Sequence, residues 1–291
     1  MAAQRDFNTI SPSAKTLLLL KSVTNIPFAK EAVHLLFSEE DRKPRDGNTP
    51  GKAFFGRLLH FENRYWSIDQ LMKGTGIKNI MEISSGFSFR GLDKVLHEDV
   101  YYIDTDLPDL IADKKEILSE FLKEKGPVIG KLITEPLNAL DEDAFLKLVK
   151  KFPPGPVCII NEGLLVYFNL EEKEKIASII YKVLEERGGC WITADVYIKN
   201  TGTAETSDYG QYGQKFAKFL AAHHVEENKF ESFDAARDFF TQCGFNIDHI
   251  NTIAYDKLSS LRLLEGKTEI TEDIVKQWLK VRETWMLKVK N

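Results

Sequence analysis

The sequence predicts an α/β fold built on a doubly wound, mostly parallel sheet, with helices added outside it. A buried apolar run leads into the segment EISSGFSFRGL at 82–92. A second run, VYYIDTD, ends in two acids about twenty residues after Glu82, the spacing of a first β-α-β unit in a nucleoside-binding sheet. From Val128 onward, apolar runs alternate with helical patterns, which extends this unit into a larger sheet.

The domain limits follow from where the strand patterns begin and end. Residues 1–75 contain helical patterns and no convincing strand, so we expect an N-terminal helical cap. The sheet core is expected over 76–265, with a cap or lid insertion at 199–230. Residues 266–291 are expected to form a C-terminal helix.

The first unit of the core predicts a ligand site. A strand at 79–83 delivers the chain to a tight turn at Gly86, and a helix over 88–97 then presents free N–H groups to a ligand. Asp104 and Asp106 lie where the next strand ends, close enough to take the two hydroxyls of a ribose.

The turn itself limits the ligand class. It carries one glycine, and Ser84 and Ser88 stand where a full dinucleotide fingerprint has two more. A nucleoside that carries a small carboxylate therefore fits better than a bulky pyrophosphate.

The other elements follow from apolar periodicity bounded by Gly and Pro. Strands are expected at 128–134, 156–161 and 189–198, and from Phe245 onward. Helices are expected at 141–152, at 170–187 and directly before Gly244. The run SSLRLL at 259–264 is expected to be an antiparallel partner strand.

Two segments keep alternative interpretations. The insertion opens with NTGTAETSDYGQYG, which is typical of a lid or binding loop and also of a mobile connector. The segment 271–290 places Ile274, Trp278, Val281 and Trp285 along one helical face. That face either docks onto the sheet of its own chain or forms a homodimer contact.

Composition argues against several classes of protein. The net charge of −5, without a long Lys/Arg run, argues against a nucleic-acid partner. Cys158, Cys190 and Cys243 are scattered singly, so we expect reduced thiols and no zinc or other metal site. The aliphatic run 17–20 is too short to cross a bilayer or to act as a signal core. We therefore expect a cytoplasmic enzyme with no membrane partner.

Four segments together resemble the leucine carboxyl methyltransferase family, including its bacterial branch of polyketide-pathway O-methyltransferases. They are ISPSAKTLLLLKS, EISSGFSFR, YYIDTDLPDLIADK and NEGLLVYFNLEEKEKI, and they cover roughly residues 10–195. The resemblance implies a Rossmann-like class I methyltransferase fold that uses S-adenosylmethionine, with a seven-stranded sheet whose last strand is antiparallel. It also implies a helical cap formed by the N-terminus and by an insertion after the fifth strand.

The resemblance assigns cofactor roles to residues of this chain. Lys21 matches a basic residue near the methionine part of the cofactor, and Arg64 matches an arginine that pairs with its carboxylate. Asp106 matches the ribose-binding acid, with Asp104 beside it. Glu162 matches an acid beside the methionine moiety, where a carboxylate can balance ammonium and sulfonium charges.

The chain also departs from the family pattern at two places. In the loop, Ser84 stands where the family usually has glycine, and Ser88 at the third position is also not glycine; a serine is tolerated there if its φ is negative. Pro136, Leu137 and Asn138 replace the acid expected at the adenine edge, where the Asn138 carbonyl oxygen can accept from the adenine amino group.

The acceptor side has weaker candidates. Tyr167, Tyr209 and Tyr212 are expected to line the substrate pocket, although Tyr209 and Tyr212 fit equally well as packing residues of the cap. One of the adjacent pair His223 and His224 is a candidate base for a phenol acceptor. The remaining histidines fit structural roles: His34, His60, His97 and His249.

The function expected from the sequence is O-methylation of a small-molecule acceptor at a carboxylate or a hydroxyl. The lack of a convincing base favours a carboxylate or an acidic hydroxyl, and a protein C-terminal carboxylate is the less favoured acceptor. A non-catalytic S-adenosylmethionine-binding or regulatory protein on the same fold is the main alternative. A nicotinamide-dependent oxidoreductase is less favoured because GxGxxG is missing.

Overall fold

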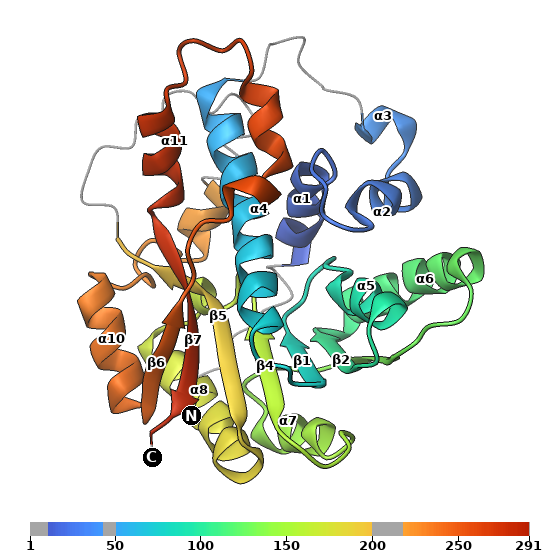
Figure 1. The fold of residues 1–291 in the computed structure, drawn as a ribbon, viewed down its shortest axis with the longest axis vertical. Coiled ribbons are helices and arrows are strands. Elements are labelled where there is room, and N and C mark those ends of the chain that lie inside the picture. The colour runs from blue at the N-terminus through green and yellow to red at the C-terminus, as the bar shows by residue number, and fades with distance from the viewer. Residues whose placement is uncertain (1–10, 43–50, 200–217, 291) are drawn as a thin grey trace.

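The chain folds around one sheet whose parallel strands end at a common edge (Figure 1). The computed structural model describes residues 11–42, 51–199 and 218–290. Within these residues, seven strands form the sheet in the order β3-β2-β1-β4-β5-β7-β6. Their bounds are β1 Asn79–Ile83, β2 Tyr101–Asp106, β3 Lys131–Pro136, β4 Val157–Asn161, β5 Gly189–Tyr197, β6 Phe245–Ile250 and β7 Arg282–Val289. The last strand, β7, is antiparallel to both β5 and β6, so the fold implied by the sequence is confirmed.

The helices divide between an N-terminal group and the crossovers of the sheet. The first group is α1 Ser11–Lys21, α2 Ala29–Leu36, α3 Glu39–Arg42 and α4 Lys52–Lys73. The others are α5 Arg90–His97, α6 Pro108–Lys125, α7 Glu142–Val149, α8 Leu170–Arg187, α10 Phe233–Gln242 and α11 Glu272–Leu279. The described part of residues 1–75 contains helices and no strand, and its role as a cap stays a prediction. None of the described helices is long and apolar enough to span a membrane.

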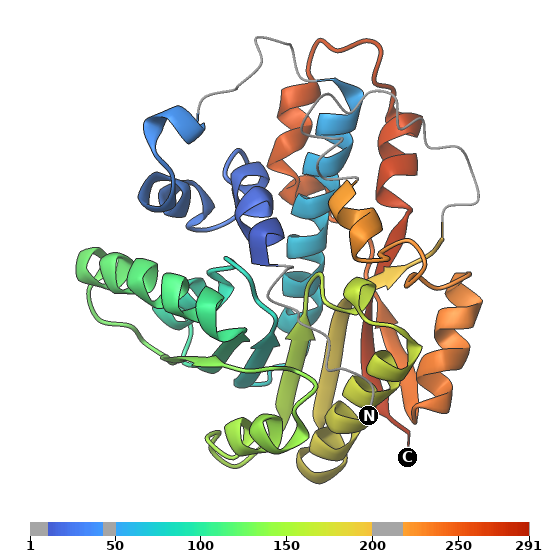
Figure 2. The same ribbon diagram turned by 180° about the vertical axis from the view of Figure 1, so that it is seen from behind.

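Each face of the sheet is covered by apolar side chains that alternate along the strands. On one face, α4 and α5 pack against the strands through Ile68, Leu71 and Val95. On the other face, which Figure 2 shows from behind, lie α7, α8 and α10. These helices pack through residues such as Phe145, Ile180 and Phe240. Because strands buried on both faces cannot slip by one residue without exposing apolar side chains, the register of the carboxyl ends is fixed.

The first β-α-β unit matches the prediction with two differences. The expected strand at 79–83 is β1, and β2 ends at Asp106 as expected. However, α5 begins at Arg90, two residues after the expected start at 88. The turn between them is wider because Ser84 (φ 53°) and Gly86 (φ 55°) are both left-handed. The condition under which a serine is readily tolerated at position 84, a negative φ, is therefore not met.

The long helix α4 connects the cap to the sheet. Its last turns lie on the sheet face, and its first turns extend beyond the carboxyl edge between α1 and α11 (Figure 1). The buried Glu62 carboxylate accepts from the backbone N–H groups and hydroxyls of Ser259 and Ser260, at 2.5 to 2.9 Å. Ser67 lies 2.6 Å from the Thr284 hydroxyl of β7. Polar side chains of one helix thus hold both the C-terminal segment and the sheet.

The C-terminal region corrects two expectations. Residues 266–291 do not form one helix: α11 ends at Leu279 and β7 begins at Arg282. The run RETWMLKV alternates and buries Thr284 and Met286 on one face and Trp285 and Leu287 on the other. The four apolar positions of the expected helix keep a helical spacing across the boundary between α11 and β7. The sequence pattern therefore did not indicate that the helix ends there. The run 259–264 forms a 3₁₀ helix rather than a strand.

The remaining expectations for single elements and for the cysteines agree closely with the structure. The strand expected at 128–134 is β3 and begins at Lys131. The helix expected at 170–187 is α8, with the same bounds, and Asn169 and Glu172 form a capping box at its start. Cys158 and Cys190 are buried and free, as expected, whereas Cys243 is only half-buried.

We predict that Trp285→Ala lowers the free energy of unfolding by about 3–5 kcal/mol, because it leaves a large cavity between the sheet and α10. The matched control is Lys288→Ala on the same strand, whose side chain is half exposed and which should change stability by less than about 0.5 kcal/mol. Urea denaturation measures both. A loss at Trp285 as small as that at Lys288 would contradict the placement of Trp285 in a central strand.

Candidate functional site

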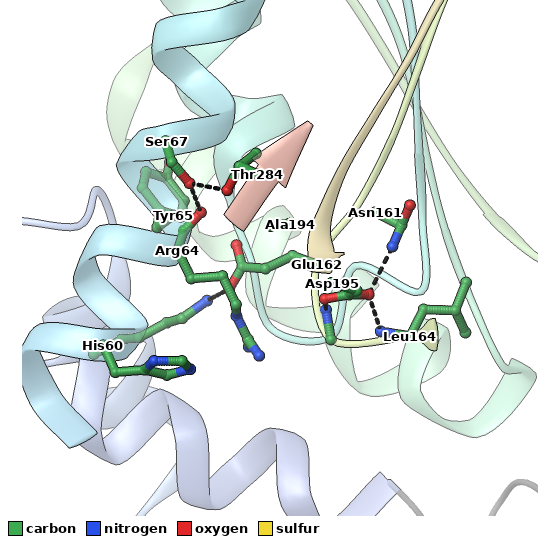
Figure 3. Close-up of polar contacts among 12 residues, drawn as sticks. His60, Arg64, Tyr65, Ser67, Asn161, Glu162, Leu164, Ala194, Asp195 and Thr284 are labelled. Atoms are coloured by element: carbon green, nitrogen blue, oxygen red, sulfur yellow. Dashed lines mark hydrogen bonds and ion pairs between the residues drawn. The ribbon is translucent and has the colours of Figure 1, made fainter. Parts of the chain in front are cut away.

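A cluster of buried charges lies where the carboxyl ends of β1, β2, β4 and β5 meet α1 and α4. Open α/β sheets bind ligands at this edge, because the loops that follow parallel strands converge there. Figure 3 shows Arg64 reaching from α4 toward Glu162, with His60 one turn away on the same helix. Chain segments far apart in sequence therefore contribute to one site.

Glu162, directly after β4, is the centre of the cluster. Lys21 Nζ donates to Glu162 Oε1 at 2.5 Å, and Arg64 Nε donates to the same oxygen at 3.2 Å. Arg90 Nη2 donates to Glu162 Oε2 at 3.2 Å. These contacts bring together Lys21, Arg64 and Glu162, which the resemblance assigns to one cofactor, and add Arg90.

The charge of Glu162 is set by these cations. Burial disfavours the carboxylate, but Lys21, Arg64 and Arg90 outweigh it and hold the pKa of Glu162 well below its usual value. Glu162 is therefore ionised at all physiological pH values. A buried carboxylate with such partners is a strong electrostatic centre whose removal leaves uncompensated cations.

Arg90 was not among the sequence candidates, although it is the first residue of α5. Its Nη1 donates to Glu82 Oε1 at 2.5 Å and its Nε donates to Asp69 Oδ1 at 2.8 Å. Its guanidinium also lies 4.0 Å from the centre of the Tyr65 ring. Arg90 thus connects β1, α4 and Glu162. Its position in FSFR, just after the turn, was the available signal.

Asp195 near the end of β5 is a second residue that the sequence analysis missed. Its carboxylate accepts from the backbone N–H groups of Gly163, Leu164 and Leu165 at 2.6, 2.7 and 3.0 Å, and from Asn161 Nδ2 at 2.6 Å (Figure 3). These bonds fix the turn that carries Glu162.

Gly163 allows Arg64 to approach that turn. Its φ is +80°, and a Cβ at this position would lie 3.2 Å from Arg64 Nη1 and Nη2. Any side chain at Gly163 would therefore strain the turn and crowd the guanidinium.

Asp106 closes the turn after β1. Its Oδ2 accepts from Gly86 N and its Oδ1 accepts from Leu107 N, both at 2.7 Å. Burial raises the pKa of Asp106, although these two N–H groups oppose the shift. Each oxygen keeps a second lone pair for another donor.

Asp104 faces a different partner. It is buried, and its Oδ2 lies 2.6 Å from Lys114 Nζ of α6. Lys114 also donates to Ser85 at 2.8 Å, while Asp104 Oδ1 has no partner among the described residues. Asp104 therefore holds Lys114 in place, and Lys114 in turn contacts the turn at Ser85.

The residues expected at the adenine edge follow β3. Leu137 is buried, and its N–H donates to the Asp106 carbonyl at 2.8 Å. The Asn138 side-chain oxygen accepts from Leu140 N at 3.1 Å, which forms a local turn and leaves this oxygen one further lone pair.

The residues proposed for the acceptor side differ in their burial and their neighbours. Tyr167 is buried after β4, and the His223 ring lies 6.2 Å from its ring and 4.4 Å from that of Phe219. His224, in contrast, is exposed beside Glu227. Tyr209 and Tyr212 lie outside the described residues, so their assignment stays a prediction.

A third group that the sequence analysis missed lies beside Arg64. The Tyr197 hydroxyl at the end of β5 lies 3.2 Å from Arg64 Nη1 and 2.8 Å from His60 Nε2. His60 was expected to be a structural residue. The contact spans 137 residues of sequence, so no local pattern indicates it.

Comparisons with known proteins give only distant structural likenesses. No family model matches the chain, and no curated protein matches its sequence. Similar solved structures include the magnesium protoporphyrin IX methyltransferase of Synechocystis PCC 6803 with bound SAH. It is 9% identical, with 95% of this chain and 100% of that chain covered and a TM-score of 0.47.

Two further structures have the same score. The cyclopropane synthase MmaA2 of Mycobacterium tuberculosis is 14% identical, with 78% of this chain and 84% of that chain covered and a TM-score of 0.47. An O-methyltransferase family protein of Burkholderia thailandensis is 12% identical, with 100% and 74% covered and a TM-score of 0.47. Likeness at this level says nothing about activity, and the fold is established by the strand order of the chain itself.

We predict that Glu162→Gln destabilises the protein by about 3–5 kcal/mol at pH 7, because Lys21, Arg64 and Arg90 lose their shared anion. The folded pKa of Glu162 is depressed, so its stabilisation is complete above the unfolded value near 4.3 and is lost as pH falls toward the folded value. The difference between the two proteins should therefore be constant from about pH 7 to 5 and shrink below about pH 4.

The control for this prediction is Glu120→Gln, the same chemical change at an exposed pair with Lys123, which should cost at most about 1 kcal/mol. Chemical denaturation between pH 3 and pH 7 measures both variants. A Glu162 variant that behaves like the Glu120 variant at pH 7 would show that the buried cluster does not depend on this carboxylate.

Proposed function

We propose that the chain is an S-adenosylmethionine-dependent O-methyltransferase that acts on a small-molecule acceptor. The observation that carries the proposal is the set of groups gathered at one edge of the sheet. The left-handed turn after β1 and Asp106 of β2 lie at one part of this edge. The cluster of Lys21, Arg64 and Glu162 lies next to them, where β4 ends. The relation to the leucine carboxyl methyltransferase family is part of this proposal and is supported by the motifs in the sequence.

The groups present suit the cofactor. The free lone pairs of Asp106 fit the two hydroxyls of a ribose. Arg64 is held at Nε and Nη1, and its Nη2 donates to no acceptor among the described residues, so this nitrogen is available to a carboxylate. Glu162 Oε2 accepts from Arg90 alone in the described part of the chain, which leaves a lone pair for an ammonium group. Leu137 and Asn138 would border the adenine.

The chemistry asks little of the protein beyond alignment. S-adenosylmethionine, when bound, supplies a methyl group on a positively charged sulfur, so the leaving group is already activated. The chain has to hold an acceptor oxygen in line with that methyl group and exclude water, an orientation effect worth several kcal/mol. The cap helices α1 and α4, which lie over the carboxyl edge, are placed to exclude water from this region (Figure 1).

An apolar ring-bearing compound suits the acceptor side. Tyr167, Tyr197 and Val225 form a small buried cluster with Phe219. Of the two candidate bases, His223 faces Tyr167 and His224 faces solvent, so His223 is the better candidate. The bacterial branch of the resembled family also favours a small molecule over a protein C-terminus.

Calorimetric titration with S-adenosylmethionine, S-adenosylhomocysteine and NADH tests the cofactor. We expect micromolar binding of the first two and none of NADH. Binding without turnover on a panel of phenols and carboxylic acids would favour the non-catalytic alternative. Binding of NADH alone would favour an oxidoreductase and overturn the proposal.

We predict that Arg64→Ala and Asp106→Ala each weaken S-adenosylhomocysteine binding at least tenfold, or about 1.4 kcal/mol. The matched control is Asp99→Ala, an exposed acid that pairs with Lys78, which should leave the affinity within about twofold. Thermal unfolding of each variant verifies that it is folded. Unchanged affinity in both site variants would disprove the site assignment.

A further inference from the structure

The hydrogen bonds around Tyr197 define a direction for its proton. Arg64 has donors and no acceptor, so at the 3.2 Å contact its Nη1 donates and the Tyr197 oxygen accepts. The Tyr197 hydrogen then needs an acceptor of its own. Among the described residues, the atom at hydrogen-bond distance that can accept it is His60 Nε2, at 2.8 Å. His60 must therefore be neutral, with its hydrogen on Nδ1.

The surroundings of His60 keep it neutral. Burial and the positive charges of Arg282 and Arg64 hold the pKa of His60 well below its usual value; Lys229 adds to this effect and Glu162 opposes it. Arg282 stands opposite Tyr197 in the sheet and donates to the neutral oxygens of Thr284 and Ser67. Burial raises the pKa of Tyr197, so the phenol also stays neutral.

The hydrogen bonds that connect His60, Tyr197 and Arg64 lead to the guanidinium proposed to hold the cofactor carboxylate. Arg64 is fixed at two nitrogens, by Glu162 through Nε and by Tyr197 through Nη1, and these two bonds define the plane of its guanidinium. A fork onto a carboxylate needs that plane to be set in advance. Loss of the Tyr197 bond would leave the bond to Glu162 as the one described hydrogen bond that orients the guanidinium.

We propose that His60 and Tyr197 are positioning residues of the proposed cofactor site: neutral His60 accepts from Tyr197, and Tyr197 in turn orients Arg64 toward the cofactor carboxylate. Protonated His60 can only donate, which leaves the Tyr197 hydrogen without an acceptor and places a cation beside Arg64. Cofactor affinity therefore falls when His60 is protonated. The proposal rests on the proposed function.

Calorimetry with S-adenosylhomocysteine on four proteins tests the role. We expect His60→Leu and Tyr197→Phe to weaken binding at least fivefold at pH 7.5. His60→Gln keeps an acceptor at the Nε2 position and cannot titrate, so it should bind within about threefold of the unaltered protein. As pH falls through the depressed pKa of His60, which lies well below the ordinary value of about 6.5, the unaltered protein should lose more affinity than His60→Gln.

A double-mutant cycle separates positioning from general packing. If His60 acts through Arg64, His60→Leu has little further effect on affinity in an Arg64→Ala background. Equal effects in both backgrounds, or a His60→Gln variant as weak as His60→Leu, would overturn the proposal. Asp106, whose pKa burial raises, can contribute its own acid-side loss, but that loss is common to the unaltered protein and His60→Gln.

A measurement without cofactor tests the hydrogen-bond chain separately. Long-range ¹H–¹⁵N NMR of histidine-labelled protein, with His60 assigned from His60→Gln, should show a neutral ring protonated at Nδ1 at pH 7. A charged His60 ring, or one protonated at Nε2, would disprove the proposed hydrogen bonds from His60 through Tyr197 to Arg64, whether or not S-adenosylhomocysteine binds. Correct NMR signals together with no binding of S-adenosylhomocysteine would instead overturn the proposed function, and with it the role given to the chain.

Discussion

The architecture of the site depends on the buried carboxylate of Glu162. It is the shared anion for Lys21 of α1, Arg64 of α4 and Arg90 of α5, and it projects from the turn after β4. Without it, Lys21 and Arg64 would be buried without a described carboxylate partner, and Arg90 would keep only Glu82 and Asp69. Burying such uncompensated charge destabilises the protein far more than an exposed ion pair stabilises it. The carboxylate is in turn held by Asp195, which fixes the backbone of the same turn from β5. Cap and sheet are therefore joined electrostatically at the place where an open sheet binds ligands.

The helix α4 transmits this constraint to the rest of the molecule. An ordinary amphipathic helix buries apolar residues, but α4 also buries Glu62, Arg64 and Ser67. Each of these has a partner on another segment: Ser259 and Ser260 for Glu62, Glu162 and Tyr197 for Arg64, and Thr284 for Ser67. Buried polar groups must be paired to be tolerated, so the position of α4 is specified more narrowly than apolar packing alone would specify it. A cap of this kind is part of the site rather than a cover placed over it.

The sequence predicted what local patterns can encode. The bounds of α8 and β1, and the position of Asp106 at the end of its strand, follow from periodicity and turn chemistry. β7 was mistaken for helix because its Trp285 continues the apolar spacing of α11, and only burial on both faces reveals the alternation. Arg90 had a local signal, its position in FSFR just after the turn. Asp195, His60 and Tyr197 were missed for a different reason. Their partners lie far away in sequence, so their roles exist only after the fold has brought them together.

The charge balance of the site explains why orientation matters more than charge in the proposed binding. Among the described residues of the cluster, the cations Lys21, Arg64 and Arg90 are balanced by Glu162, Glu82 and Asp69. The amino-acid end of S-adenosylmethionine is zwitterionic, so it adds no net charge to such a cluster and gains little from long-range attraction. Its affinity must come from short, directed hydrogen bonds, whose strength depends on the angle of each donor. A neutral His60 that sets the orientation of Tyr197, and through it the plane of Arg64, acts on this angle without disturbing the balance of charge.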